Sequence, residues 1–204
     1  IIKVITSIIL TDMNAYEFKE EKHKELWKLI EEDNKFRKKL KKCLQETLYI
    51  GDGAFKVTID TEVSEYPIIE WNSGERIEII RHRDRVREVI FKTPHTDNQQ
   101  KYVLHERYGY GYIKNELYKG DSLVDFKTIN ATMNLSDWEF DKKLMLAVPF
   151  NVFESNKYEW RGGSVFDGKQ DSFDAFDEVW SQWMDALRAG RAKEYIPECF
   201  LPRN

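Results

Sequence analysis

The chain has 204 residues, of which 33% are charged and 41% apolar. This length suits one large domain or two small ones, and an aromatic content of 14% excludes an intrinsically disordered chain. A formal charge of −4 provides no general attraction to nucleic acid or to anionic membranes, so any such contact must come from a local patch.

The N-terminal stretch from Ile1 to Leu10 is apolar but too short to span a bilayer. It contains one lysine and no small-residue cleavage pattern, so it is a poor secretion signal. We expect it to pack as a strand or a helix end. Because the chain begins without Met and stops at Pro202-Arg203-Asn204 without a helix cap, we also expect it to be a piece of a longer protein.

Residues 16 to 50 are expected to form two helical runs that are broken near Asp33-Asn34. Apolar side chains repeat at helical spacing along both runs. Gly51-Asp52-Gly53 is then expected to end the second helix and turn the chain, since glycine tolerates positive φ. These helices form the first expected domain, residues 1 to 50.

The second expected domain, residues 51 to 160, is a β domain in which short strands follow one another through brief turns. This order predicts an antiparallel meander and not a βαβ sheet. A further strand is expected from Lys142 to Val148, closed by Pro149. The other expected strands are 54–60, 67–72, 76–81, 85–93, 101–108, 111–118 and 123–128.

The clearest helix of the sequence extends from about Ser172 to Ala189, with Gly190 as its C-terminal stop. We expect its apolar stripe to be buried against protein and its acidic side to face solvent or a channel. The third expected domain, residues 161 to 204, contains this helix, and the fold class is α+β. The stripe consists of Phe173, Phe176, Trp180, Trp183 and Leu187, and the acidic side carries Asp174, Glu178 and Asp185.

Histidines and glycines do not form a recognisable catalytic or cofactor motif. His82, His95 and His105 lack the spacing of a ligand set, and no His-x-x-x-His or Cys-x-x-Cys occurs. Gly109-Tyr110-Gly111 lacks the third glycine of a dinucleotide-binding fingerprint, and a strand follows it where that fingerprint needs a helix. We therefore expect no enzymatic activity, no metal and no cofactor.

A few carboxylates and thiols remain as alternatives. Asp52, Asp60 and Glu62 would suit a metal-dependent nuclease, but Asp52 is expected in a turn and no lysine motif of that chemistry accompanies them. Cys43 and Cys199 are expected to be free structural thiols, because the two residues lie far apart and a metal site needs further ligands.

Two groups of basic residues are either solvated faces, the reading we favour, or phosphate contacts. One group crowds the second helical run, and the other alternates along a strand region that carries partly neutralising acids. The helix group is Lys35, Arg37, Lys38, Lys39, Lys41 and Lys42, and the strand group is Arg81, Arg83, Arg85 and Arg87.

Four stretches, taken in order, resemble bacteriophage portal proteins of siphophages and prophages of Gram-positive bacteria, over most of the chain from about Phe36 to Pro202. Their order is more specific than any one of them. They are the helix that leads into Gly51-Asp52-Gly53-Ala54-Phe55-Lys56; Tyr102-Val103-Leu104-His105-Glu106-Arg107-Tyr108-Gly109-Tyr110-Gly111-Tyr112-Ile113, continued by Asn115-Glu116-Leu117-Tyr118; Ala147-Val148-Pro149-Phe150-Asn151; and Gly163-Ser164 through Asp174-Ala175-Phe176-Asp177-Glu178 and Ser181-Gln182 to the helix end.

This resemblance implies a structural subunit of a head–tail connector, a ring of usually twelve copies at one capsid vertex. The ring surrounds the channel for DNA packaging and ejection, and double-stranded DNA passes through it without sequence-specific contact. Terminase, head-completion, scaffold and capsid proteins are the implied partners, and a membrane is not. The implied location is the virion, and the host cytoplasm during assembly.

Within such a subunit the strands resemble the wing, and the helix from Ser172 resembles the first stem helix. A second stem helix, a tunnel loop and a crown are not evident, and the clip is at most begun, so we do not expect the isolated chain to form a ring. Two other functions remain open. A carbohydrate-binding or tail-associated β module predicts a row of exposed aromatic rings on the sheet, and a metal-dependent nuclease predicts three or more converging carboxylates.

Overall fold

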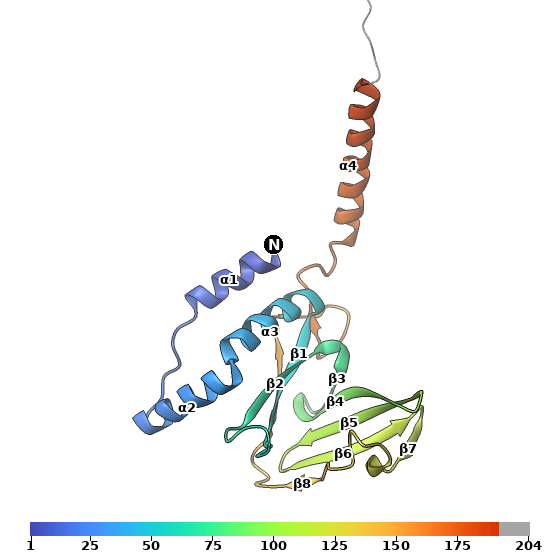
Figure 1. The fold of residues 1–204 in the computed structure, drawn as a ribbon. Coiled ribbons are helices and arrows are strands. Elements are labelled where there is room, and N and C mark those ends of the chain that lie inside the picture. Colours follow the sequence, from blue (N-terminus) through green and yellow to red (C-terminus); the bar gives the residue numbers. More distant parts are fainter. Residues whose placement is uncertain (192–204) are drawn as a thin grey trace, which may run out of the picture. The chain divides into compact units, whose positions relative to one another are not determined.

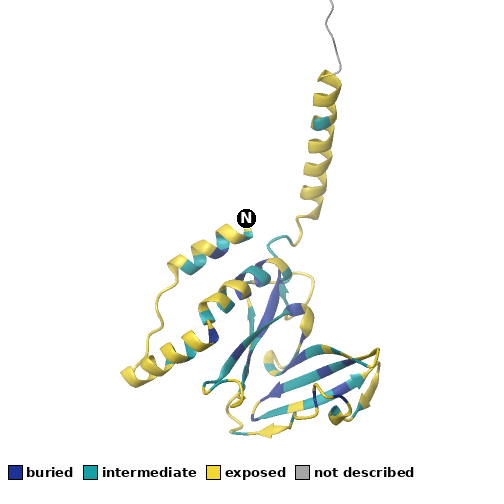
Figure 2. Ribbon diagram, viewed as in Figure 1, coloured by how far each residue is buried: buried dark blue, intermediate teal, exposed yellow. Residues whose placement is uncertain are grey.

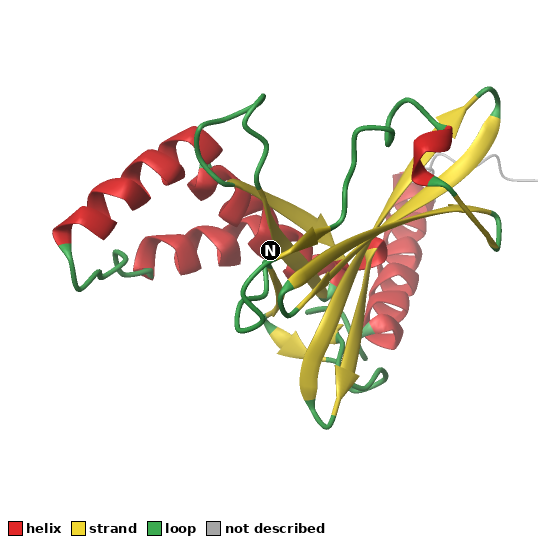
Figure 3. Cartoon of the chain, turned by 90° about the horizontal axis from the view of Figure 1, so that it is seen from below, coloured by secondary structure: helices red, strands yellow, loops and turns green. Residues whose placement is uncertain are grey.

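The computed structural model describes residues 1–191 and combines helices with antiparallel sheets (Figures 1 and 3), which confirms the expected α+β class. The chain divides into two compact units, one from Ile1 to Val165 and one from Phe166 onward. The N-terminal helices therefore share a unit with the strands, because the third helix packs against the first two strands.

Three helices begin the first unit: α1 (Ile2–Asp12), α2 (Glu21–Asn34) and α3 (Phe36–Ile50). The expected break between two helical runs is present, and it falls at Lys35, whose φ of 49° is left-handed. The apolar N-terminal stretch is not a strand but the helix α1, which packs against α3 and buries Thr6.

A three-stranded antiparallel sheet follows, in the order β2 (Ile68–Ser73), β1 (Asp52–Thr58) and β9 (Ala147–Asn151). The expected three-residue turn is shorter than predicted, since Gly51 alone has a positive φ of 123° and Asp52 already begins β1. Pro149 was expected to close its strand but lies within β9, where it faces Ala54. An edge strand tolerates proline because one side of its backbone needs no partner.

The second sheet is the expected meander, in which each strand pairs antiparallel with the next. Its seventh predicted strand is cut short, because a 3-10 helix (Phe126–Thr128) follows it, capped by the side chain of Asp125. Its strands are β3 (Ile77–His82), β4 (Arg85–Asp97), β5 (Gln100–Gly109), β6 (Tyr112–Lys119) and β7 (Ser122–Val124), with β8 (Trp138–Glu139) beside β6.

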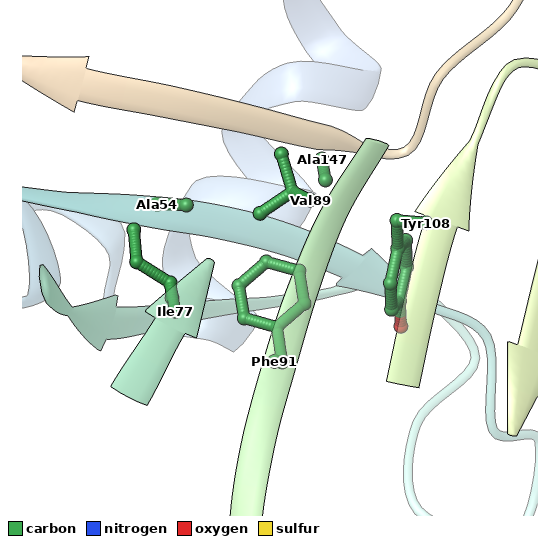
Figure 4. Close-up of a cluster of buried hydrophobic side chains, with 6 residues drawn as sticks. All are labelled: Ala54, Ile77, Val89, Phe91, Tyr108 and Ala147. Carbon is green, nitrogen blue, oxygen red and sulfur yellow. The ribbon is translucent and has the colours of Figure 1, made fainter. Parts of the chain in front are cut away.

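One of the two core clusters of this unit lies where the two sheets meet. The rings of Phe91 and Tyr108 pack edge to face with centroids 5.2 Å apart, and both residues are almost fully buried. Lys56 of β1 adds a polar link to β5 through Glu106, at 2.7 Å from Nζ to Oε2. Figure 4 shows the cluster, which is Ala54, Ile77, Val89, Phe91, Tyr108 and Ala147.

A short hairpin completes the first unit. It pairs β10 (Phe153–Glu154) with β11 (Gly162–Gly163), and β11 packs against α3. Glycine is required here, because a Cβ on Gly51 would lie 2.4 Å from the carbonyl oxygen of Gly162. The backbones of the helix end and of the hairpin therefore approach each other directly.

The second unit contains α4 (Gln170–Arg191), two residues longer at each end than expected. Gly190 does not stop the helix but lies inside it, since glycine permits a left-handed turn without imposing one. No residue of α4 is buried, as its colouring in Figure 2 shows. Cys199 and the expected beginning of a clip lie outside the described residues.

Candidate assembly surface

The expected apolar stripe of α4 consists of four aromatic side chains and Leu187, all of them exposed. At 3.6 residues per turn its five side chains fall within one narrow sector of the helix. Neighbouring rings contact one another, with centroids 6.2 Å apart for Phe176 and Trp180 and 5.2 Å apart for Trp180 and Trp183. Each of the five is close to half exposed or more, Trp183 at 52%.

Exposure of this stripe means that the second unit does not supply its own cover. An amphipathic helix gains most of its stability from burying its apolar side against protein. Contiguous exposed aromatic area of this kind is typical of surfaces that contact another protein, a membrane or a ligand. We refer to Phe173, Phe176, Trp180, Trp183 and Leu187 as the aromatic stripe.

The acidic side of α4 lies opposite the aromatic stripe. Asp174, Glu178 and Asp185 are exposed. Glu178 accepts a hydrogen bond from Gln182 at 3.2 Å, and Asp185 pairs with Arg188 at 3.2 Å. These contacts are surface contacts between neighbours on one helix and contribute little to stability. The acidic side therefore carries accessible negative charge.

The carboxylates that suggested a nuclease do not come together. Asp52 begins β1, whereas Asp60 and Glu62 follow its far end, and a strand rises about 3.3 Å per residue. Asp52 is occupied by Arg161, and Asp60 accepts a hydrogen bond from the backbone of Glu62. Among residues 1–191 no group of three or more His, Cys, Asp and Glu is arranged to hold a metal ion.

The three histidines are also separate. His82 is exposed at the end of β3, and His95 lies in β4 with a buried Nε2. His105 of β5 packs its ring 4.5 Å from that of Tyr118, and burial together with the nearby Lys92 lowers its pKa. Each of them has a local structural environment of its own.

One face of the second sheet is covered by an ion-pair network that sequence reasoning did not predict. Arg107 of β5 contacts Glu88 of β4 at 2.6 Å and Glu116 of β6 at 3.5 Å. Burial alone would raise the pKa of Glu88, but hydrogen bonds from Tyr112 and Arg107 outweigh it and hold the pKa below its ordinary value. The only sequence signal for this network was the alternation of charges along neighbouring strands.

The sheet does not display the aromatic row that a carbohydrate-binding module needs. Phe91, Tyr102 and Tyr108 are buried, and the hydroxyls of Tyr112 and Tyr118 donate hydrogen bonds to glutamates. Exposed rings lie only at the margin of the described sheet, Trp138 in the short strand β8 and Tyr110 in the β5–β6 turn, and they form no row along its strands.

Comparison with known proteins adds no family to this description. No protein-family model matches the sequence, and no curated protein matches it.

Three residues of the basic group on α3 already have partners within the first unit. Lys39 reaches the backbone oxygen of Ile69 at 2.5 Å, Arg37 pairs with Glu31, and Lys42 pairs with Glu46. The remaining lysines of this group are exposed. Between residues 1 and 191, no helix is both long enough and apolar enough to cross a membrane.

Proposed function

We propose that this chain is a structural subunit of a bacteriophage portal ring, the head–tail connector through which DNA is packaged and ejected. The aromatic stripe of α4 is the observation that carries this proposal. A helix of 22 residues without a single buried side chain is suited to burial by another subunit.

A second copy of the same chain is the partner that the helix suits. Its first turn carries Asp171 and its last turn carries Arg188 and Arg191, so the helix has an acidic and a basic end. Staggered neighbouring copies would bring opposite charges together, which fixes register across an interface. Repetition of one such interface around an axis closes a ring.

The acidic side is suited to a DNA channel. Asp174, Glu178 and Asp185 lie on the surface of α4 that remains uncovered when the aromatic stripe is buried. Negative charge repels the phosphates of a passing duplex, so DNA slides without being held.

The first unit supports the same proposal through its order along the chain. Helices followed by an antiparallel meander precede α4, as the wing precedes the first stem helix in the family that the sequence resembles. The terminase, head-completion, scaffold and capsid proteins are proposed as partners on that resemblance. The proposed role needs no catalytic group, and the chain is proposed to act without a cofactor.

The test is the mass of the particle formed by the complete open reading frame that contains this chain. Native mass spectrometry of the purified product is expected to give a closed ring with a single subunit number, near twelve. A product that remains monomeric at all concentrations and salt conditions overturns the proposal.

A further inference from the structure

The structure contains a basic pocket that the ring interface does not use. Antiparallel pairing brings the β3–β4 turn and the β5–β6 turn to the same end of the second sheet. Between them lies a pocket of about 360 Å³. Its lining residues are His82, Arg85, Val86, Arg87, Tyr110 and Tyr112.

Both arginines of this pocket are available for a ligand. Arg85 and Arg87 are exposed, and neither has a carboxylate within ion-pair distance in the described part of the chain. The acid of the network that acts on Arg87 is Glu88, whose oxygens are hydrogen-bonded to Arg107 and Tyr112, so it attracts Arg87 electrostatically without forming an ion pair with it. Two unpaired guanidinium groups therefore border one pocket.

A loop from a distant part of the sequence adds further positive charge. Gly111 in the β5–β6 turn donates a backbone hydrogen bond to Leu144 at 2.9 Å, and a Cβ at Gly111 would lie 2.6 Å from the Cα of Lys142. This contact places Lys142 and Lys143 beside the same turn. Asp141 lies next to them and accepts the backbone N–H of Lys143, so the two lysines together add one more positive charge than this carboxylate removes.

The two tyrosines of the pocket differ in whether their hydroxyl groups are hydrogen-bonded. The hydroxyl of Tyr112 is bonded to Glu88 and its ring lies under the ammonium of Lys114, at 5.5 Å. Tyr110 is 51% exposed, and its hydroxyl makes no hydrogen bond within residues 1–191. One free phenolic donor therefore stands beside the two free guanidinium groups.

We propose that this end of the second sheet binds the phosphate groups of a duplex DNA backbone. Arginine, lysine and tyrosine are among the side chains that contact phosphate oxygens, and arginine binds them through two parallel N–H donors. Such contacts carry no sequence information, so binding is independent of sequence and weakens steeply with salt.

Arginine clusters bind acidic peptides as well as phosphate groups. Here the basic residues are spread over three segments of one sheet end, β3, β4 and the loop at Lys142, which suits the repeated charges of a phosphate backbone. The choice of DNA as ligand rests on the proposed portal function, whereas the pocket itself is a property of the single chain.

The test measures binding of a labelled mixed-sequence duplex to the 204-residue chain by fluorescence anisotropy over a salt series. The double variant Arg85→Gln/Arg87→Gln is compared with Lys38→Gln/Lys41→Gln, which removes the same charge from exposed positions on α3. Affinity falls as salt rises, and the slope of log affinity against log salt is expected to be less steep by about 1.8 in the first variant. Each of the two lost phosphate contacts contributes about 0.9 to that slope. The second variant is expected to bind like the unaltered chain.

Three results overturn the proposal: no measurable binding at low salt, equal loss in both variants, or tighter binding of labelled polyglutamate than of duplex with the same dependence on Arg85 and Arg87. Circular dichroism establishes that both variants are folded. Native mass spectrometry of the protein made from the complete reading frame with Arg85→Gln/Arg87→Gln shows whether the two arginines are needed for ring assembly, independently of DNA binding. A ring that forms but does not bind DNA supports the site, and DNA binding by a protein that never forms a ring overturns the portal function alone.

Discussion

Arg161 donates two hydrogen bonds to the carboxylate of Asp52, from Nε at 2.5 Å and from Nη2 at 2.8 Å. Asp52 is only 4% exposed, and it also accepts the backbone N–H of Gly162. The same guanidinium reaches the carbonyl oxygen of Gly74. This pair joins the start of β1 to the β10–β11 hairpin, more than one hundred residues later in the sequence.

Asp52→Ala is expected to lower the free energy of unfolding of the chain by about 2–3 kcal/mol. It leaves the Gly162 N–H and the Arg161 guanidinium without their acceptor, and partial exposure of Arg161 limits the cost. Urea unfolding followed by circular dichroism measures the change. Glu62→Ala, at an exposed acid whose side chain has no ion pair among residues 1–191, is the control and should stay within about 0.5 kcal/mol. Equal stability of the two variants would show that the pair does not hold the hairpin.

Acidification is expected to weaken the network around Glu88. The pKa of Glu88 is lower in the folded chain than in the unfolded one, so its stabilising contribution is complete above the unfolded pKa of about 4.3 and is lost as pH falls through the folded value. Glu88→Gln should therefore reduce stability at about pH 7 and make less difference at about pH 3.

The control for that experiment is Glu75→Gln. Glu75 is exposed and forms no ion pair in the described part of the chain. Its urea midpoint should follow that of the unaltered protein at both pH values. A Glu88→Gln deficit that stays constant with pH would show that the carboxylate charge is not the stabilising element.

The Cys43 thiol is expected to be inert in the folded chain. Burial raises its pKa to about 12, so almost no thiolate is present near neutral pH. In a Cys199→Ser variant, a disulfide reagent such as Ellman's reagent should release no colour until urea unfolds the protein. Rapid reaction under native conditions would indicate that α3 opens locally.

The chain is expected not to cleave DNA with Mg²⁺ or Mn²⁺. Asp60 and Glu62 follow the opposite end of β1 from Asp52, so the three carboxylates cannot bind one metal ion together. Incubation of purified protein with plasmid and each metal, followed by electrophoresis, measures this. Metal-dependent cleavage that disappears in Asp60→Ala would establish the nuclease instead.

Local patterns in the sequence predict much of the fold. The period of apolar side chains predicts α2, α3 and α4, and alternation with turn residues predicts the meander from β3 to β6. The assignment of β1, β2 and β9 to a separate sheet could not be predicted, because it depends on a pairing between residues almost one hundred positions apart, such as Ala54 and Pro149.

The candidate sites were predictable in part. The aromatic stripe follows from helical geometry alone, because it needs one helix and no tertiary contact. Its exposure does not follow, since the same pattern marks helices that pack within their own domain. The pocket at Arg85 and Arg87 was visible only as a basic alternation. Tyr110 and Lys142 join it through strand pairing and a loop contact that no short motif encodes.

Trp183→Ala is expected to change the free energy of unfolding of the chain by less than about 1.5 kcal/mol, because the side chain is half exposed and its main contact is the ring of Trp180. Leu48→Ala is the matched control. Leu48 is fully buried in α3, so its truncation should cost about 2–5 kcal/mol. A cost for Trp183→Ala as large as that for Leu48→Ala would show that the aromatic stripe packs within its own subunit.

The mass of the particle formed by the complete reading frame carrying Trp180→Ala and Trp183→Ala tests the central claim most directly. Gln182→Ala, on the opposite side of the same helix, is the control. We predict that native mass spectrometry shows rings for the unaltered protein and the control, and folded monomers for the double variant. Rings of normal mass from the folded double variant would contradict the assignment of the aromatic stripe as the assembly surface.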